Sequence, residues 1–363
     1  MKKFILLVVV ILFFIAFAGI SGNESVGPLL LVAQHKSANF SGVEINPEDL
    51  KLFQPLPEVI ISSKNPLSEE KIALGRMLYF DKRLSRGKDI SCNDCHQLDK
   101  YGVDNESRSK GFKGQLGGRN SPTVYNAAAH VAQFWDGRAP DVEEQAKGPV
   151  LNPVEMAMPD DKAVVVVLKS IPGYMAAFMK AFPEDKDPMT YDNVGKAIGA
   201  FERKLVTASR WDDFLKGDKA ALTNAEKIGF NKFMEAGCQK CHSGSLVGAG
   251  IFAKLGTMKE WPDKSDPGRY QVTRNNSDRM RFKVSSLRNV EKTAPYYHDG
   301  SVATLDKAVD LMAEFQLGKS LSHDDVRFIS AWLKTLTGRI PVDYVKPPEL
   351  PPDETRNSPV GAY

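Results

Sequence analysis

The sequence predicts a mainly α-helical protein made of two modules of related plan. Apolar residues recur at spacings of three and four, the period of an amphipathic helix, ahead of each of two similar motifs. These residues are Leu74, Met77 and Leu78 in the first module, and Phe230, Phe233 and Met234 in the second. Strand-like alternation of apolar and polar residues is scarce in the 363 residues, so we expect little β structure.

The two motifs are Cys-x-x-Cys-His runs, at 92–96 and 238–242, and they contain all 4 cysteines of the chain. Such a run is the attachment motif of a c-type haem. Two thiols three positions apart can each add to one vinyl group of a porphyrin, and the next residue places an imidazole on the iron. The predicted cofactor-binding residues are therefore Cys92, Cys95, His96, Cys238, Cys241 and His242.

A four-cysteine zinc site and a dithiol redox centre are the alternatives for such cysteines. Neither needs a histidine directly after the second cysteine, and both motifs have one. A zinc site would also favour motifs that lie much closer together in the chain. We therefore expect two covalently bound haem c groups, held by two cytochrome c-like haem domains with little β structure.

The N-terminus has the pattern of an export segment. Lys2 and Lys3 precede an uncharged run from Phe4 to Ile20, and Ala16-Phe17-Ala18 offers a cleavage site. Residues 1–22 are thus expected to be a signal peptide or, because the run is nearly long enough to span a bilayer, an N-terminal membrane anchor. Either alternative predicts an exported protein. The net charge of +3 does not favour a nucleic-acid partner.

The remaining chain divides by composition and by helix signals. We expect a polar linker, a first haem domain, a second haem domain and a Pro-rich tail extended over the surface, at 23–46, 47–215, 216–340 and 341–363. Helices are expected to begin at Ser68, Thr190, Thr223 and Ser322. The second of these should reach Thr207, and the last should end at Gly338.

The sequence similarity between the two modules extends beyond the haem motifs. Trp135-Asp136-Gly137 is followed by a helical run through Glu143 and Gln145. His298-Asp299-Gly300 is followed by a helical run through Leu305, Ala308 and Met312. Two modules of related plan are the simplest account of this similarity.

The sixth coordination position of each iron decides its function, because a second strong ligand makes an electron-transfer haem and an open position allows a small oxidant to bind. For the second haem, Met312 is the candidate ligand, with Met280 as a competitor and core filling as the alternative for either. For the first haem, the stretch 97–120 contains neither His nor Met, and His130 is the only spare histidine of the module. Composition therefore permits an open first haem.

Acidic and amide side chains are available to serve an open haem. Glu143, Glu144 and Gln145 cluster after Trp135, although helix charges of this kind are usually solvated. Glu155 differs, because it stands among the apolar neighbours of the segment 151–158. Burial of that carboxyl would raise its pKa toward the range that suits acid–base catalysis.

These residues resemble the bacterial di-haem cytochrome c peroxidases over roughly Pro57 to Pro341. The likeness is carried by Leu74 to Asp81, Ser91 to His96, Asn120 to Thr123, Phe134 to Arg138, Asn152 to Met156, Thr293 to His298 and Gln316 to Lys319. The resemblance implies a periplasmic enzyme that reduces hydrogen peroxide to water with electrons from a small cytochrome c or cupredoxin, and it suggests a homodimer.

The resemblance also implies roles for individual residues. The first haem, with His96 as proximal ligand, would be the peroxidatic centre, with Glu155 as acid–base carboxylate and Gln145 beside it. The second haem, ligated by His242 and Met312, would receive electrons. Trp135 would relay electrons between the haems. A calcium ion at the interface would be bound by the side chain of Asn120 and the carbonyls of Thr293 and Pro295, which are oxygen ligands of the kind calcium prefers.

One position departs from the family pattern. Many members carry a distal histidine in the loop before Asn120, which ligates the peroxidatic iron until the other haem is reduced, and the matching residue here is Phe112. We therefore expect an open first haem already in the oxidised protein, with His130 as the residue to examine as a substitute ligand. His298 matches a family histidine near the second haem, whereas His35 and His323 are expected at the surface.

Two other functions compete with peroxide reduction. A di-haem electron carrier would need six-coordinate iron at both sites, and would not be expected to carry the matches at Glu155 and Gln145. A di-haem oxidase that acts on tryptophans of a partner protein uses a tyrosine as axial ligand of the second haem. Met312 at the matching position favours the peroxidase.

Overall fold

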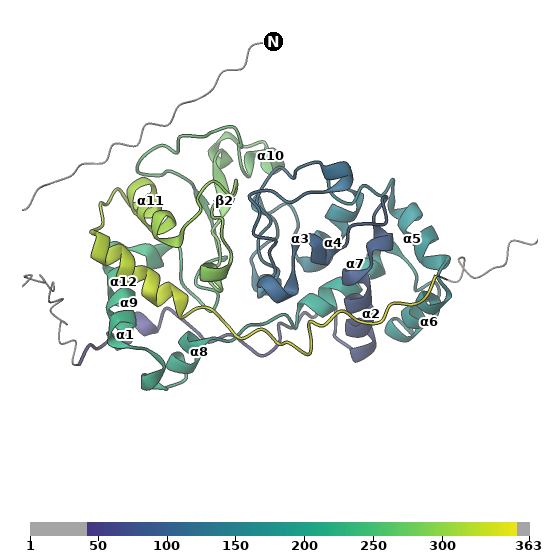
Figure 1. The fold of residues 1–363 in the computed structure, drawn as a ribbon, viewed down its shortest axis with the longest axis horizontal. Coiled ribbons are helices and arrows are strands. Elements are labelled where there is room, and N and C mark those ends of the chain that lie inside the picture. The colour runs from purple at the N-terminus through teal and green to yellow at the C-terminus, as the bar shows by residue number, and fades with distance from the viewer. Residues whose placement is uncertain (1–41, 354–363) are drawn as a thin grey trace, which may run out of the picture. The chain divides into compact units, whose positions relative to one another are not determined.

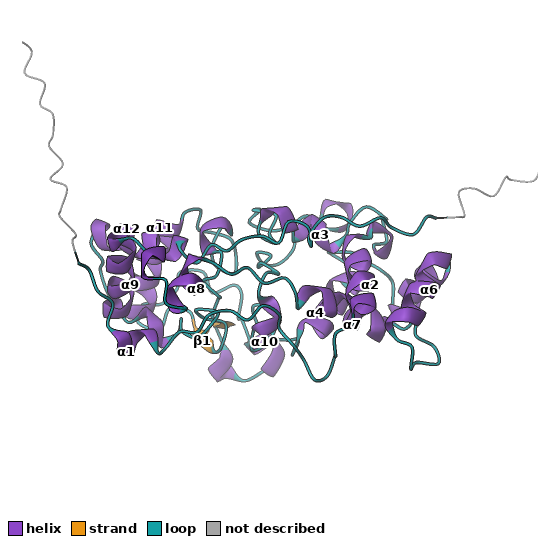
Figure 2. Cartoon of the chain, turned by 90° about the horizontal axis from the view of Figure 1, so that it is seen from below, coloured by secondary structure: helices purple, strands orange, loops and turns teal. Residues whose placement is uncertain are grey.

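The computed structural model describes residues 42–353 of the chain (Figure 1). The predicted export segment, most of the predicted linker, His35 and the last ten residues of the tail lie outside the described residues. Helices dominate the described part, and one small sheet pairs β1 (Phe252–Lys254) with β2 (Arg281–Lys283) in antiparallel register, Ala253 opposite Phe282 (Figure 2). The expectation of a mainly α fold with little β structure is confirmed.

Some helices are joined by short turns, and others by long loops such as 96–141 and 237–269. The α-helices are α1 (Pro47–Leu50), α2 (Glu69–Phe80), α3 (Cys92–Cys95), α4 (Val142–Leu151), α5 (Asp161–Lys169), α6 (Pro172–Ala181), α7 (Tyr191–Glu202), α8 (Arg210–Leu215), α9 (Asn224–Ala236), α10 (Tyr270–Thr273), α11 (Leu305–Leu317) and α12 (His323–Lys334). Short 3₁₀ turns include η4 (Ala127–Ala129), η6 (Cys238–Lys240) and η8 (Val290–Lys292).

Each haem motif is preceded by a helix that crosses a later helix at a glycine. In the first module α2 packs on α7, and a Cβ at Gly75 would overlap the carbonyl oxygen of Ala197. In the second module α9 packs on α12, and a Cβ at Gly229 would overlap the carbonyl oxygen of Phe328. The two helix pairs therefore approach closely because their crossing points carry no side chain.

The predicted helix starts are confirmed by their caps. The Ser68 hydroxyl accepts from the backbone N–H of Lys71 at 3.1 Å, and Thr223 and Glu226 form the capping box before α9. Thr190 and Ser322 cap α7 and α12 in the same way. Each start could be predicted because an N-cap acts on groups only two or three residues away.

The predicted ends of two helices were wrong. The helix from Thr190 ends at Glu202 instead of Thr207, because the backbone N–H of Thr207 donates to the side chain of Asn126 at 3.0 Å. The last helix ends at Lys334 instead of Gly338, because the N–H of Gly338 donates to the side chain of Asn289 at 2.9 Å. Both ends are thus set by asparagines far away in the sequence.

Two aromatic-rich cores support the two haem motifs. The first contains Tyr79, Tyr125 and Phe201, and the second is centred on Trp211, Phe230 and Trp332. The order of the chain does not match the division into cores, because Phe53 precedes the first haem motif and yet packs in the second core. The tail was expected on the surface, but Tyr344 stacks on Phe201 at 5.0 Å and Val345 is buried in the first core.

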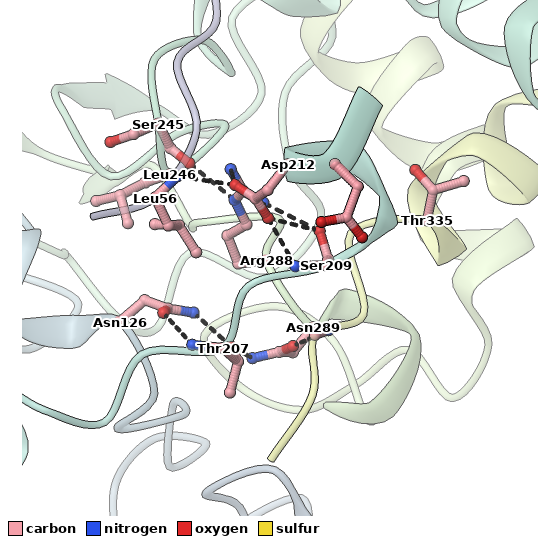
Figure 3. A network of polar contacts seen from close by, with 12 residues as sticks. Leu56, Asn126, Thr207, Ser209, Asp212, Ser245, Leu246, Arg288, Asn289 and Thr335 are labelled. Atoms are coloured by element: carbon pink, nitrogen blue, oxygen red, sulfur yellow. Dashed lines mark hydrogen bonds and ion pairs between the residues drawn. The ribbon is translucent and has the colours of Figure 1, made fainter. Parts of the chain in front are cut away.

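A buried ion pair anchors the segment that leads from the first module to the second (Figure 3). Arg288 donates to both carboxylate oxygens of Asp212 at 2.7 and 3.0 Å, and both side chains are almost fully buried. Burial alone would raise the pKa of Asp212, but Arg288 and the backbone N–H groups of Leu56 and Ser209 lower it. The pair therefore stays ionised and fixes α8 against the loop before η8.

Within residues 42–353 no single helix has the length and apolar character needed to cross a membrane, and α5 with α6 meets those criteria only as a pair bent by 108°.

Candidate functional site

The first Cys-x-x-Cys-His motif lines a large cavity of about 1160 Å³. Cys92, Cys95 and His96 all contribute to its wall. Gln145 and Glu155, the two side chains expected to serve an open haem, line the same cavity. The structure therefore brings together residues that lie up to about sixty positions apart in the sequence.

The motif is held in place by short polar contacts. Asp94 accepts from the backbone N–H and the hydroxyl of Ser91 at 2.8 and 2.7 Å, which caps α3 at its first turn. The hydroxyl of Tyr79, a fully buried residue of α2, donates to the carbonyl oxygen of His96 at 2.8 Å. Burial lowers the pKa of His96, so its imidazole is neutral and has a lone pair for a metal.

The second motif lines a separate, smaller and mainly apolar cavity of about 200 Å³ with Met312. Burial lowers the pKa of His242 to about 4, and Nδ1 of this neutral ring lies 3.4 Å from the carbonyl oxygen of Val247. A proton on Nδ1 would leave Nε2 free as a ligand. The competitor Met280 instead packs with Trp261 and Phe315 in a small apolar cluster, as a core methionine does.

Both cavities fit covalently attached haem in their donor chemistry. Each has two free thiols and one neutral imidazole in its wall, and all four cysteines are free of disulfides. Burial raises the pKa of the thiols, to about 11 for Cys95 and about 12 for Cys238, so they are neutral SH groups. Raised thiol pKa values disfavour metal binding as thiolates, and the Cys-x-x-Cys-His spacing suits attachment to porphyrin vinyl groups.

Glu155 stands at the first cavity with a raised pKa. Burial raises the pKa of this carboxyl, and the positive charge of Arg138, which also lines the cavity, lowers it in part. The turn that carries Glu155 is closed by the N–H of Met156, which donates to the carbonyl of Pro149 at 3.1 Å. A carboxyl held in this way, with a raised pKa, can exchange a proton while remaining in position.

The loop that carries Phe112 packs directly on Glu155. The N–H of Phe112 donates to the carbonyl of Glu155 at 2.7 Å, and a Cβ at Gly111 would overlap the carbonyl of Val154. Among the described residues, the wall of the first cavity includes Gly111 but not Phe112. The phenyl ring lies instead near the cations of Arg86 and Lys113, at 5.6 and 5.4 Å.

The other acidic residues of this region have structural contacts. Glu143 forms a buried pair with Arg203 at 2.8 Å and accepts from Asn65 at 2.9 Å. Glu144 is exposed and bonds Lys147 on the same helix. The expectation of a solvated helix charge is therefore confirmed for Glu144 and wrong for Glu143, which is buried.

His130 lies at the first cavity in contact with a buried lysine. Nζ of Lys283 is 2.9 Å from Nδ1 of His130, whereas Nε2 has no hydrogen-bond partner among residues 42–353. While Lys283 keeps its proton it can only donate, so Nδ1 accepts and the ring proton occupies Nε2. In that tautomer Nε2 has no lone pair for iron, which disfavours His130 as a ligand.

Three side chains line both cavities, namely Trp135, Lys283 and His298. The indole of Trp135 and the imidazole of His298 meet edge to face, with ring centroids 6.4 Å apart. His298 is buried and stacks on Phe282 at 4.3 Å. Aromatic rings therefore form a continuous wall between the two candidate haem sites.

The residues expected to bind calcium converge on one segment of the chain. The amide of Asn120 donates to the carbonyl of Glu106 at 2.9 Å. The amide of Asn105 donates to the carbonyls of Lys292 and Ala294, which flank Thr293, at 3.2 and 2.9 Å. Among residues 42–353 no group of three or more His, Cys, Asp or Glu is placed to hold a metal, and a site of one amide and backbone carbonyls needs none.

Two buried ionisable residues of these walls were not predicted from the sequence. Glu202 on α7 lines the first cavity, and burial raises its pKa to about 8. Burial lowers the pKa of Lys283 to about 7. Glu202 lies four positions after Ile198 on the apolar face of α7, which is a signal in the sequence, whereas β2, with the sequence Arg-Phe-Lys, gives no such signal for Lys283. His323 is exposed at the start of α12, as expected.

Comparison with known proteins identifies a family model and relatives whose names all refer to cytochrome c peroxidases. A family model described as di-haem cytochrome c peroxidase matches residues 69–220. The chain is 46% identical to cytochrome c551 peroxidase of Pseudomonas aeruginosa over 301 residues, 81% of this chain and 86% of that one. It is 46% identical to cytochrome c551 peroxidase of Nitrosomonas europaea over 304 residues, 82% and 90% of the two chains.

A solved structure is similar over the same part of the chain. It is a MauG-like protein associated with microbial copper homeostasis, with a TM-score of 0.72 and 28% identity, and the match covers 81% of this chain and 97% of that one.

Proposed function

The chain belongs to the di-haem cytochrome c peroxidase family, and from this premise we propose that it reduces hydrogen peroxide to two waters with two protons and two electrons. The observation that supports this proposal is that Glu155, Gln145 and His96 all line the first cavity. When bound there, a haem would supply the iron at which the O–O bond is reduced. The remaining steps are assigned to side chains of this chain.

Glu155 is assigned the acid–base role. Its ionised carboxylate accepts a proton from one peroxide oxygen and delivers it to the other, which leaves as water. Burial raises the pKa of Glu155, which places the proton exchange closer to neutral pH. Gln145 lines the same cavity, and its amide can donate to and accept from the peroxide oxygens, which orients them.

Electrons are proposed to enter at the second cavity and to cross by way of Trp135. Met312 and His242 line the second cavity together, as the two axial ligands of an electron-transfer haem should. Trp135 belongs to the walls of both cavities, which supports its role as the relay. A small cytochrome c or cupredoxin would be the donor.

The first haem is proposed to be open in the oxidised protein. The position that carries a distal histidine in many relatives is Phe112, whose ring lies outside the lining of the first cavity. Its loop is fixed by the bond from Phe112 N–H to Glu155 and by the absence of space for a side chain at Gly111. Peroxide would therefore reach the site without prior reduction of the second haem.

Three further assignments complete the proposal. Calcium would bind Asn120, Thr293 and Pro295. A common site is supported by the bond of Asn120 to Glu106 and by the bonds of the adjacent Asn105 to Lys292 and Ala294, which flank Thr293. The protein would be exported to the periplasm through its N-terminal segment and would act as a homodimer. The two haem domains would correspond to 47–215 and 216–340, with residues near Phe53 packing on the second core.

Substitution of Glu155 tests the function. Purified Glu155→Gln with both haems attached is mixed with peroxide and a reduced small cytochrome c, and donor oxidation is followed by absorbance. Loss of a general acid–base group should lower turnover by about 10²- to 10⁴-fold. Glu144→Gln is the matched control, because the same change on an exposed carboxyl of α4 should leave turnover unchanged. Unchanged kinetics of Glu155→Gln would remove Glu155 from the mechanism, and a wild-type protein without turnover would refute the peroxidase.

A further inference from the structure

The two modules contain a repeated segment whose residues correspond with a constant offset of 163 positions. The segment starts at Asn126 and Asn289, which both have a positive φ of 62° and both donate from their amides to the hydroxyl of Thr207, at 3.0 and 2.9 Å (Figure 3). The 3₁₀ turns η4 and η8 follow at 127 and 290. The two asparagines thus have the same φ and bond the same threonine.

The correspondence continues through the turn that carries Trp135 and His298. Isolated antiparallel bridges join Gln133 to Ala139 and Tyr296 to Val302. The residues before Trp135 and His298 have positive φ values of 64° and 70°, and the glycines at 137 and 300 have 69° and 64°. Because these conformations are uncommon for residues other than glycine, their recurrence at one offset indicates a true internal repeat. Trp135 and His298 are therefore counterparts, and they meet at the boundary between the cavities.

The repeat then enters a helix in each module. Asp141 is the N-cap of α4 and Thr304 is the N-cap of α11, again 163 positions apart (141 and 304). Three equivalent positions of the two helices face the cavities: Gln145, Ala146 and Pro149 of α4 line the first, and Ala308, Val309 and Met312 of α11 line the second. The same helix face is thus directed at each candidate haem.

Pro149 is the counterpart of Met312. Both are the eighth residue of their helix, and both line the cavity of their own module. A thioether can ligate iron, whereas the proline ring has no donor atom. The two modules therefore differ at the helix position that would supply the methionine ligand of the second haem.

A second proline, Pro153, sets where the first of these two helices ends. α4 ends at Leu151 because Asn152, the residue before Pro153, has an extended backbone with ψ of 120°, whereas α11 continues to Leu317. After Leu151 the chain turns back, with the N–H groups of Asn152 and Met156 both donating to the carbonyl of Pro149, at 3.2 and 3.1 Å. That turn carries Glu155 to the first cavity.

We propose that Pro149 keeps the first haem open: it replaces the axial methionine of the repeat with a side chain that cannot ligate iron, and its carbonyl closes the turn that carries Glu155 to the same cavity. This inference rests on the haem assignments of the proposed function, but not on peroxide turnover. It predicts that one substitution converts the first site into a copy of the second.

The test is Pro149→Met in the protein with both haems attached, fully oxidised, measured by low-temperature EPR and near-infrared magnetic circular dichroism. We expect the high-spin signal of the first haem to disappear and the charge-transfer band of a methionine-ligated ferric haem to double in intensity. Methionine is a better helix former than proline, so α4 should tolerate the change. Pro149→Leu is the control, because it restores the N–H and a similar apolar bulk without a ligand, and it should keep the high-spin signal.

Several outcomes would overturn the proposal. A Pro149→Met protein that retains the full high-spin signal would do so, as would a wild-type first haem that is already low-spin. If Pro149→Met does not assemble with haem, Met312→Leu tests the equivalence of Pro149 and Met312 at the second haem instead. It should make the second haem high-spin and abolish the methionine band, and an unchanged band overturns the equivalence. Loss of turnover without any EPR change would count against this inference and leave the peroxidase proposal standing.

Discussion

The indole N–H of Trp135 donates to the backbone carbonyl of Asn120 at 2.9 Å. The proposed electron relay is therefore fixed by the residue whose side chain is the proposed calcium ligand. The backbone N–H of Asn120 in turn donates to the carbonyl of His298 at 2.8 Å, so the chain at Asn120 holds both aromatic residues that separate the cavities.

Trp135→Phe should slow electron transfer between the haems while leaving both haems attached. Phenylalanine keeps an apolar ring in the wall but loses the bond to Asn120 and the larger indole π system. Stopped-flow absorbance after reduction of the second haem measures the transfer directly. Phe134→Leu, a change to the neighbouring ring that lines only the first cavity, is the control. Equal transfer rates in Trp135→Phe and wild type would assign the relay to other atoms.

Asn120→Ala should remove bound calcium and destabilise the protein. The variant loses the proposed side-chain ligand together with the buried bond to Glu106, and one lost bond of this kind costs about 1–3 kcal/mol. Calcium content by atomic emission and urea unfolding are the measurements.

Asn105→Ala is the matched control for the calcium site, because it removes the amide bonds to Lys292 and Ala294 without removing a proposed ligand. It should keep the calcium. If Asn120→Ala also keeps it, with an unchanged affinity in chelator titration, the ion is bound elsewhere or not by this side chain.

The parts of the site that the sequence predicted are those whose geometry is local. Each haem motif places its thiols and its imidazole within five consecutive residues, and an N-cap such as Ser68 bonds a residue three positions away. The apolar neighbours of Glu155 and the helix position of Gln145 made both residues candidates, but only the family resemblance implied that they share a cavity, since nothing near them in the sequence indicates it.

Residues placed by long-range packing escaped prediction for physical reasons. Lys283 is in a strand of three residues, too short to show a period, and its partner His130 is 153 positions away. The ends of α7 and α12 are fixed by Asn126 and Asn289 in the same manner. The equivalence of Pro149 and Met312 was also hidden, because it becomes visible only when the backbone repeat is superimposed on the two cavities.

The pH dependence of turnover should follow Glu155. Its carboxylate must be ionised to accept the peroxide proton, and burial raises its pKa, so activity should fall as the pH drops through that raised pKa. Arg138 lowers the pKa of Glu155, and Arg138→Gln should therefore move the acid limb of kcat/KM to higher pH.

Lys113→Gln is the control for Arg138→Gln, because it removes one positive charge from an exposed position of the neighbouring loop. Its acid limb should stay in place. An acid limb that does not move in Arg138→Gln would show that a group other than Glu155 controls it.

Glu202 should make stability depend on pH in the direction opposite to that of a paired carboxylate. Its pKa is raised to about 8, first by burial and second by the negative charge of Glu143, while the positive charge of Arg203 opposes both. Above the ordinary glutamate pKa of about 4.3 the unfolded chain releases this proton while the folded protein retains it. Its contribution to stability is therefore complete at low pH and is lost as the pH rises toward about 8.

Glu202→Gln removes this titration, so the variant should gain stability relative to wild type as the pH rises from about 5 to about 8. Urea unfolding of both proteins with haem attached, across this range, measures the difference. The exposed Glu144→Gln should follow the wild-type curve at every pH. Parallel curves for Glu202→Gln and wild type would mean that Glu202 is ionised in the folded protein, and that the first cavity supplies it with a cation or with water.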